Sequence, residues 1–422
     1  MFKSLLIFSL RILAQATLWR YKPCIIGVTG SVGKTSTKEA IFTVLRRKFT
    51  VRRNIKNYNN ELGVPLTILD EETGGRSFWH WLKVFLVGFF GIFYTKNYPE
   101  VLVLEMGADR IGDISYLTSF VKCYIGVVTA IGEIPVHVEF FQSVSQVARE
   151  KSNLVRSLDK DGWAVLNFDD ERVRIMANQT RARIFSYGFS ENVDLRASNF
   201  EQYTEDPNEV VMSFKVDSGG NTVPIRLRNI LGRQQVYAVL AAVAVGLISK
   251  INLVEITQAL KDYQPLPGRL RFIKGIKNSL ILDDTYNASP SAMLAALDVL
   301  RVIPGRKIAA LGDMLELGAF TEEAHRQVGA EVAKTADMLL AVGERAIFLA
   351  DEARINGMSA DKVSYFASSQ GAGRFLQDSI REGDIILVKG SQGVRMEKIV
   401  KEIMAEPERA EELLVRQEAE WQ

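Results

Sequence analysis

The sequence predicts an α/β protein with two domains, each built on a mostly parallel sheet. An apolar run at residues 24–26 leads into a glycine-rich turn, and a helical pattern follows over residues 37–45. Continuous apolar runs, such as residues 101–104, are typical of strands that are buried on both faces of a parallel sheet. This alternation of strands and helices is interrupted at residues 265–269 and then begins again. We therefore place a domain boundary there.

The composition excludes several classes of protein. The 422 residues are enough for two or three domains with real cores. The net charge of +2 gives no strong field that would attract a nucleic acid. Only Cys24 and Cys123 are present, without the spacing of a metal site or a disulfide framework. We therefore expect a protein of a reducing, cytoplasmic compartment that has no nucleic-acid partner.

The N-terminal segment, residues 1–22, is predicted to form an apolar helix. Lys3 and Arg11 interrupt its apolar run, which is too short to span a bilayer, because spanning takes about 20 apolar residues. Residues 14–16 resemble a signal-peptidase site, but a strand of the first domain begins only a few residues later. We expect this helix to pack on the core or to lie on a membrane surface.

Residues 27–36 are predicted to be a phosphate-binding loop, with an ordinary tight turn as the alternative. The unpaired N–H groups of such a turn and of the following helix can wrap a polyphosphate. Lys34 would reach the terminal phosphates, and the Thr35 hydroxyl would ligate Mg²⁺. The loop is a short variant, because the usual first glycine position holds Val28. The expected nucleotide-binding residues of this loop are Gly30, Ser31, Val32, Gly33, Lys34, Thr35 and Ser36.

Two unusual segments follow the helix of this loop. Residues 57–65 form a polar cluster that ends in glycine and proline and is predicted to be a loop. Residues 78–94 are apolar and rich in aromatic side chains. Such a segment is either a buried helix or a helix that lies at a lipid interface.

Candidate metal ligands follow two buried strands. Glu105 ends the apolar run of residues 101–104, at the sheet edge where open α/β sheets bind ligands. We expect it to be an acidic partner of Mg²⁺. His137 lies in a loop after the strand at residues 124–129 and is a further candidate ligand, and Lys151 lies on the helix predicted for residues 142–158.

The first domain is predicted to cover residues 23–264, with a β-rich flap at residues 193–230. Within the flap, residues 210–216 and 222–227 have the pattern of antiparallel strands. The second domain, residues 265–405, is predicted to be a Rossmann-like α/β domain, and residues 406–422 a charged helical tail. The strands expected in the second domain are residues 280–284, 307–311, 338–342 and 384–389.

These motifs together resemble the Mur ligases over roughly residues 23–401. The motifs that carry the resemblance are residues 30–35, 59–65 and 105–108, the loop of His137, residues 283–293, residues 311–318 with Glu323 and His325, and residues 388–391 with 395–397. The resemblance implies a P-loop central domain that binds ATP, followed by a C-terminal domain. It also implies an ATP-dependent ligase of peptidoglycan precursor synthesis. Such an enzyme activates a peptidyl carboxylate as an acyl phosphate for attack by an amine, here expected to be D-Ala-D-Ala.

The resemblance also implies roles for individual residues. The expected catalytic residues are Lys34, Lys151, His137 and Arg269. Of the metal ligands, Thr35 and Glu105 would hold a first Mg²⁺, and His137 a second. Lys151 stands where the family carries a carbamylated lysine, whose anionic oxygens can bind Mg²⁺ as an ammonium cannot. Asp284, Tyr286 and Asn287 would contact the nucleotide, and Asn59, Asn60, Asp313 and Lys389 the other substrates. For Asp313 and Lys389 a role in the fold itself is the alternative.

Two departures from the family pattern bear on substrates. The family carries an N-terminal domain that binds the UDP-sugar end of the substrate, and here only about 22 residues precede the first strand. We expect that domain to be missing. The acceptor would then be recognised by its peptide end, or be lipid-linked and met at the inner membrane face, or a partner subunit would supply the domain. The other departure lies near the adenine of the nucleotide, where the family has a His-Asn pair and this chain has Gln234 and Gln235.

Two other functions stay open from the sequence. One is a related amide ligase with another substrate, such as a folylpolyglutamate-type enzyme or a modifier of lipid-linked muramyl peptides. The other is a nucleotide-binding scaffold that does not catalyse.

Overall fold

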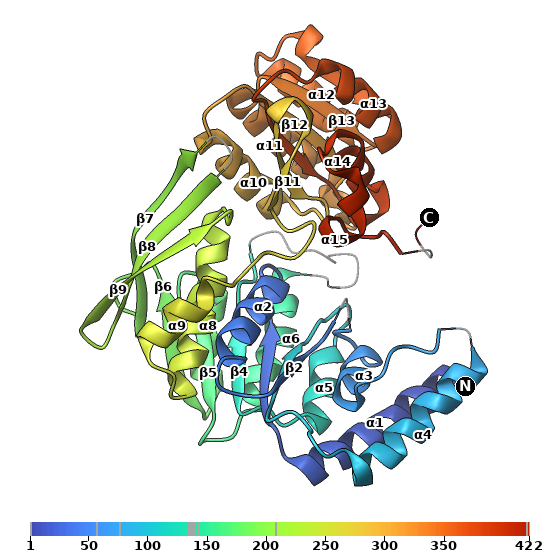
Figure 1. Ribbon diagram of the computed structural model, residues 1–422, viewed down its shortest axis with the longest axis vertical. Coiled ribbons are helices and arrows are strands. Elements are labelled where there is room, and N and C mark those ends of the chain that lie inside the picture. The colour runs from blue at the N-terminus through green and yellow to red at the C-terminus, as the bar shows by residue number, and fades with distance from the viewer. Residues whose placement is uncertain are drawn as a thin grey trace.

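The chain folds into two α/β halves that face each other across a cleft (Figure 1). The computed structural model describes residues 2–55, 58–75, 77–132, 141, 143–206, 209–418 and 421. The first half holds a sheet that is parallel over most of its width, and the second half holds a smaller sheet. The predicted fold class is confirmed.

The sheet of the first half has the strand order β2-β3-β1-β4-β5-β6-β7-β8-β9 in the described residues. Pairing is parallel from β2 to β7 and antiparallel between β7, β8 and β9. The expected β-rich flap is therefore a continuation of this sheet. The strands are β1 (Cys24–Thr29), β2 (Val51–Arg53), β3 (Val101–Glu105), β4 (Ile125–Val128), β5 (Trp163–Asn167), β6 (Arg183–Gly188), β7 (Leu195–Asp206), β8 (Glu209–Ser218) and β9 (Asn221–Arg228).

Helices cover both faces of this sheet. They are α1 (Phe2–Tyr21), α2 (Lys34–Leu45), α3 (Gly63–Leu69), α4 (Phe78–Tyr94), α5 (Asp113–Phe120), α6 (Val144–Arg156), α7 (Glu171–Ile175), α8 (Arg233–Ile248) and α9 (Leu253–Leu260). Helix α8 is apolar around most of its circumference, which suits a buried helix, and it packs with α2 on one face. Helices α5 and α6 pack on the other face.

The register of the central strands places the site. Strand β1 lies between β3 and β4, and Val28 pairs with Glu105. The turn after β1 and the carboxylate that ends β3 therefore lie side by side at one edge of the sheet.

Helices α1 and α4 lie against each other at the periphery of the first half (Figure 1). Leu6 and Leu10 of α1 pack with Trp81 and Val84 of α4 and with Leu66 of α3. Each of the two helices thus packs on the core with one face. This agrees with the expectation that the N-terminal helix packs on the core. In the described part of the chain, neither these nor any other helix is long and apolar enough to cross a membrane.

The second half has the strand order β10-β11-β15-β12-β13-β14, and only the β10–β11 pair is antiparallel. Its strands are β10 (Arg271–Lys274), β11 (Leu280–Asp284), β12 (Lys307–Gly312), β13 (Met338–Val342), β14 (Val363–Phe366) and β15 (Ile385–Lys389). Its helices are α10 (Pro290–Val302), α11 (Thr321–Thr335), α12 (Ala346–Ile355), α13 (Ser369–Ser379), α14 (Glu397–Ile403) and α15 (Ala410–Leu413).

The C-terminal tail differs from the expected charged helix. After the short helices Pro407–Arg409 and α15, the chain turns extended at Leu414, and the Arg416 side chain is buried. The Arg416 guanidinium donates hydrogen bonds to the carbonyl oxygens of Thr285 and Tyr286 and pairs with Glu397 at 2.7 Å. A buried guanidinium needs such partners, and they fix the tail beneath the loop of Tyr286.

We expect Arg416→Ala to destabilise the second half by about 3 kcal/mol, because it leaves Glu397 buried with one cationic partner fewer. Thermal unfolding followed by circular dichroism measures this. Arg409→Ala is the matched control, since Arg409 lies on the same tail but pairs only with the exposed Glu406 and Glu412. Equal melting temperatures for the two variants would contradict a structural role of Arg416.

Candidate active site

The glycine-rich turn after β1 has the strained backbone of a phosphate-binding loop. Gly30 has a φ of +146°, and a Cβ there would lie 1.9 Å from the Thr129 hydroxyl oxygen. That hydroxyl donates a hydrogen bond of 2.6 Å to the carbonyl oxygen of Val32. Gly33, with a φ of +82°, precedes the first turn of α2. Glycine is thus required where the turn approaches the end of β4.

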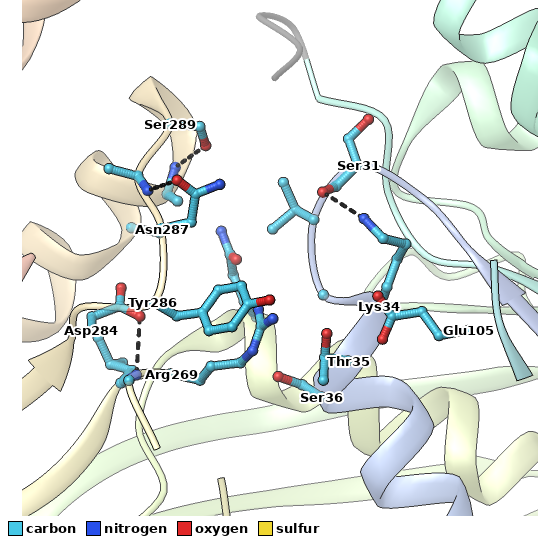
Figure 2. Close-up of a pocket in the computed structure, with 18 of the residues that line it drawn as sticks. Ser31, Lys34, Thr35, Ser36, Glu105, Arg269, Asp284, Tyr286, Asn287 and Ser289 are labelled. Carbon is cyan, nitrogen blue, oxygen red and sulfur yellow. Dashed lines mark hydrogen bonds between the residues drawn. The ribbon is translucent and has the colours of Figure 1, made fainter. Parts of the chain in front are cut away.

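Two polar side chains of the loop have few hydrogen-bond partners among the described residues. The Lys34 ammonium donates a long hydrogen bond of 3.3 Å to the carbonyl oxygen of Ser31 (Figure 2). Burial lowers the pKa of Lys34; the Arg269 charge also lowers it, whereas the Glu105 and Asp109 charges raise it. The Ser31 hydroxyl oxygen is buried without a hydrogen-bond partner in the described part of the chain. Both groups suit an anion with several oxygens.

Glu105 is held beside this loop by buried polar groups. Its carboxylate accepts a hydrogen bond of 3.1 Å from the Asn59 side chain and lies 3.9 Å from the Lys38 ammonium. Burial alone would raise the pKa of Glu105, but the charges of Lys38, Lys34 and Arg269 outweigh it, so that the pKa is lowered. Glu105 is therefore an ionised carboxylate next to the Thr35 hydroxyl (Figure 2), and both are oxygen ligands of the kind that Mg²⁺ prefers.

Lys151 of α6 faces the same cavity and is 3% exposed. Burial lowers the pKa of Lys151 to about 7, with a further contribution from the Lys34 charge, against the opposing charges of Asp109, Glu150 and Glu105. A large share of this amine is therefore unprotonated near neutral pH.

The second half supplies the opposite wall of the cavity (Figure 2). Lys389 at the end of β15 pairs with Asp284 at 2.6 Å and donates to the carbonyl oxygen of Asn287. The Arg269 guanidinium lies 3.9 Å from the centre of the Tyr286 ring, a cation–π contact. Arg269 thus points from the second half toward the P-loop.

The buried Asp283 holds the turn that carries Arg269. Its carboxylate accepts hydrogen bonds from the Gly268 N–H and from the Thr285 N–H and hydroxyl. Burial raises the pKa of Asp283 to about 6. A Cβ at Gly268 would come within 2.9 Å of the Tyr286 nitrogen, so the turn and the Tyr286 loop are closely fitted.

One cavity of about 450 Å³ joins the two walls. The structure brings these expected site residues into its lining: Ser31, Val32, Gly33, Lys34, Thr35, Ser36, Asn59, Asn60, Glu105, Lys151, Arg269, Asp284, Tyr286, Asn287 and Lys389. Their individual roles stay predictions.

Of the other expected residues, Gly30 and Asp313 are not among those that line the cavity. The Asp313 carboxylate accepts hydrogen bonds from the N–H groups of Arg345 and Ala346 at the start of α12. These bonds give Asp313 a role in the fold, which is the alternative that the sequence left open, and its contact with a substrate stays a prediction. His137 lies outside the described residues.

One end of the cavity joins Gln234 and Gln235, which the family resemblance relates to adenine, with alanines that sequence reasoning missed. Leu231, Gln234 and Gln235, before and within the first turn of α8, face small side chains of α10 there. Those side chains are Ala292, Ala295 and Ala296, whose helical spacing in the sequence is the signal that could have revealed them. The Gln235 side-chain oxygen accepts a hydrogen bond of 2.8 Å from the Tyr263 hydroxyl. This end is thus lined by two side-chain amides and by small apolar side chains.

In the described part of the chain, no three side chains of the His, Cys, Asp or Glu types gather as a metal cluster.

The fold and this cavity define a P-loop protein that binds a nucleotide between two α/β halves. The chain matches the Mur ligase middle domain over residues 28–80 and 90–246. It matches the Mur ligase, glutamate ligase domain over residues 268–392. The chain belongs to the Mur ligase family, and the expectation of an ATP-dependent ligase is confirmed at that level.

The relatives include one particular kind of Mur ligase. The chain is 30% identical over 402 residues to the UDP-N-acetylmuramoyl-tripeptide–D-alanyl-D-alanine ligase of Bacillus subtilis, covering 94% of this chain and 80% of that protein. A MurF structure from Acinetobacter baumannii is 28% identical with a TM-score of 0.76, over 92% and 79% of the two chains. A MurF structure from Thermotoga maritima in complex with ADP is 25% identical with a TM-score of 0.77, over 96% and 84%.

We expect Ser31→Ala to weaken ATP binding about tenfold, because it removes a hydroxyl that would bond a charged phosphate oxygen. The melting temperature of the free protein should stay equal or rise, since the lost hydroxyl is buried and has no partner. Ser279→Ala is the matched control, because the Ser279 hydroxyl is also buried without a described partner but lies outside the cavity lining. Titration calorimetry and thermal unfolding measure the two effects; unchanged ATP affinity in Ser31→Ala would contradict the assignment.

Lys151 should make stability depend on pH. Its pKa falls from 10.5 to about 7 on folding, so the unfolded chain holds the extra proton between these values. Below pH 7 the Lys151 amine is charged in both states, and burying it lowers the free energy of unfolding by its full amount. This penalty shrinks as pH rises from 7 toward 10.5. Lys151→Met in CO₂-free buffer should therefore gain most in melting temperature at or below pH 7 and less at higher pH. A difference from the native protein that does not vary with pH would contradict the burial of a charged amine.

Proposed function

We propose that the protein is the ATP-dependent ligase that joins D-Ala-D-Ala to the peptidyl carboxylate of a peptidoglycan precursor. The observation that carries the proposal is that the P-loop, Glu105 and Lys151 of one half face Arg269 and Lys389 of the other across a single cavity. The names of the relatives supply the substrates. A second candidate acceptor, a lipid-linked carboxylate, is favoured by the exposed apolar side chains of α1 and α4, among them Phe8, Trp79 and Phe93.

The reaction needs two anions, the triphosphate and the carboxylate, to meet. Lys34 and Arg269 would lie on either side of the γ-phosphate and offset its charge as a carboxylate oxygen attacks phosphorus and the bond to ADP breaks. The amine would then attack the acyl carbon, phosphate would leave with the carboxylate oxygen, and the nitrogen would lose a proton. Packing of the two halves around the cavity would keep water from the acyl phosphate.

The Thr35 hydroxyl and the Glu105 carboxylate are proposed to hold Mg²⁺. When bound, this ion neutralises phosphate charge. The unprotonated Lys151 amine can add to CO₂, which forms a carbamate and releases a proton. The carbamate would offer an anionic oxygen pair to a second ion, for which the family resemblance also implies His137 as a ligand.

The acceptor is proposed to lie in a second cavity of about 910 Å³ that adjoins the first. The two cavities share Thr35, Asn60, Arg269 and Tyr286 in their linings. Leu62 and Leu66 form part of one wall of the second cavity, and residues 414–418 of the tail, with Trp421, form part of another. We propose a cytoplasmic location, where ATP is available.

Phosphate release from ATP tests the proposal. With Mg²⁺ and bicarbonate, release should require UDP-muramyl-tripeptide and D-Ala-D-Ala together, and mass spectrometry should find the pentapeptide. Lys151→Ala should lower turnover at least a hundredfold, about 2.7 kcal/mol, through the loss of a catalytic electrostatic contact. Lys160→Ala, at an exposed lysine, should leave it unchanged. No release with this substrate pair would overturn the proposed acceptor, and ATP binding without turnover on any acceptor would indicate a scaffold.

A further inference from the structure

Helix α1 is apolar on two faces. Its buried stripe contains Leu6, Leu10 and Ala14. A second stripe at helical spacing is exposed to solvent: Leu5, Phe8, Ile12 and Trp19. The usual surface helix of a folded domain carries polar residues on its outer face, so packing within this chain does not explain the second stripe.

Helix α4 has the same property to a larger degree. Trp81, Val84 and Gly88 form its buried stripe, and Gly88 faces Leu13 of α1. Its exposed large apolar side chains are Phe78, Trp79, Leu82, Leu86, Val87, Phe89, Phe90, Phe93 and Tyr94. Trp79 is 75% exposed and Phe93 is 61% exposed. Soluble monomers rarely expose a continuous apolar area of this kind without a partner.

The two helices run side by side (Figure 1). We call their exposed apolar side chains together the α1–α4 face. Tyr21 at the end of α1 donates a hydrogen bond of 2.7 Å to the Gly91 carbonyl oxygen in the last turn of α4. The Tyr21 ring also stacks on the Tyr98 ring, with centroids 4.5 Å apart. These contacts fix the α1–α4 face as a rigid part of the first half.

The charged residues of α1 and α4 indicate which kind of partner covers the α1–α4 face. No aspartate or glutamate occurs in residues 1–38 or 73–99, which include both helices. The basic residues of the described helices and their ends are Lys3, Arg11, Arg20, Lys22, Lys83 and Lys96. Lys3 pairs with Glu61, the Lys83 charge acts on Glu71, and Arg11 lies over the Tyr116 ring. Helices that combine apolar, aromatic and basic side chains and contain no acidic ones have the composition of helices that lie in the headgroup layer of anionic bilayers.

The family match supports a role apart from the ligase fold. The matched ranges begin after α1 and leave out residues 81–89, the middle of α4. The α1–α4 face is thus built largely from segments that the Mur ligase domains do not require.

We propose that the α1–α4 face docks flat on an anionic membrane surface, with its aromatic side chains in the headgroup layer. Neither helix crosses the bilayer, so the attachment is interfacial and reversible by salt. Helix α3, which packs on α1, also lines the second cavity, so docking places that cavity close to the membrane. This inference does not depend on which acceptor the ligase uses.

Vesicle flotation of the full chain tests the docking. The protein should float with vesicles of equimolar phosphatidylcholine and phosphatidylglycerol, float less with phosphatidylcholine alone, and be released by high salt. The triple variant Trp79→Gln, Phe89→Gln, Phe93→Gln should bind at least tenfold more weakly. The matched control carries Val254→Gln, Phe320→Gln and Ile355→Gln, which are exposed apolar residues elsewhere, and should bind as the native protein does.

Three results would overturn the proposal: no flotation of the native protein, equal flotation of the two triple variants, or a native dimer that only the α4 variant dissociates. The last result would assign the face to a second copy of the chain. ATP affinity and melting temperature check that both variants fold. A second variant, Arg20→Glu with Lys83→Glu, keeps the apolar side chains and should lose the preference for phosphatidylglycerol.

Discussion

The site depends on positive charge gathered near the Glu105 carboxylate, which Asp109 and Glu150 offset only in part. Lys34, Lys38 and Arg269 act on Glu105, and Lys151 lies on the same cavity. Burial lowers the pKa of Lys34, Lys38 and Lys151, so these amines are costly to keep charged without more anions. In the proposed reaction, a polyphosphate and a carboxylate would supply the missing negative charge. The free protein therefore carries a site whose electrostatics are completed by its substrates.

The two halves contribute to the site by different means. In the first, the register of β1 and β3 brings the P-loop to Glu105, and the rigid sheet fixes their distance. In the second, the Tyr286 loop is fixed from below by Arg416 and from the side by Lys389 through Asn287. The C-terminal tail thus supports the site although it lies far from it in sequence.

Much of this could be predicted from the sequence because it is local. Apolar runs identify buried strands, glycine spacing identifies the P-loop, and a carboxylate that ends a strand, such as Glu105, must lie at the sheet edge. Long-range pairing could not be predicted. Arg416 was missed because a pattern of charges does not show a guanidinium that bonds residues 130 positions away. For Asp313, the motif gives the residue type but not the direction of its side chain. That direction is set by hydrogen bonds from backbone N–H groups at the start of α12.

The central claim is that this cavity activates a carboxylate by phosphoryl transfer from ATP. Oxygen-isotope transfer tests it most directly: the acceptor peptide is labelled with ¹⁸O in its carboxylate, and the released phosphate is analysed by mass spectrometry. An acyl phosphate requires one labelled oxygen to appear in phosphate for each peptide bond formed. Product without label in phosphate, or label in AMP, would contradict the account.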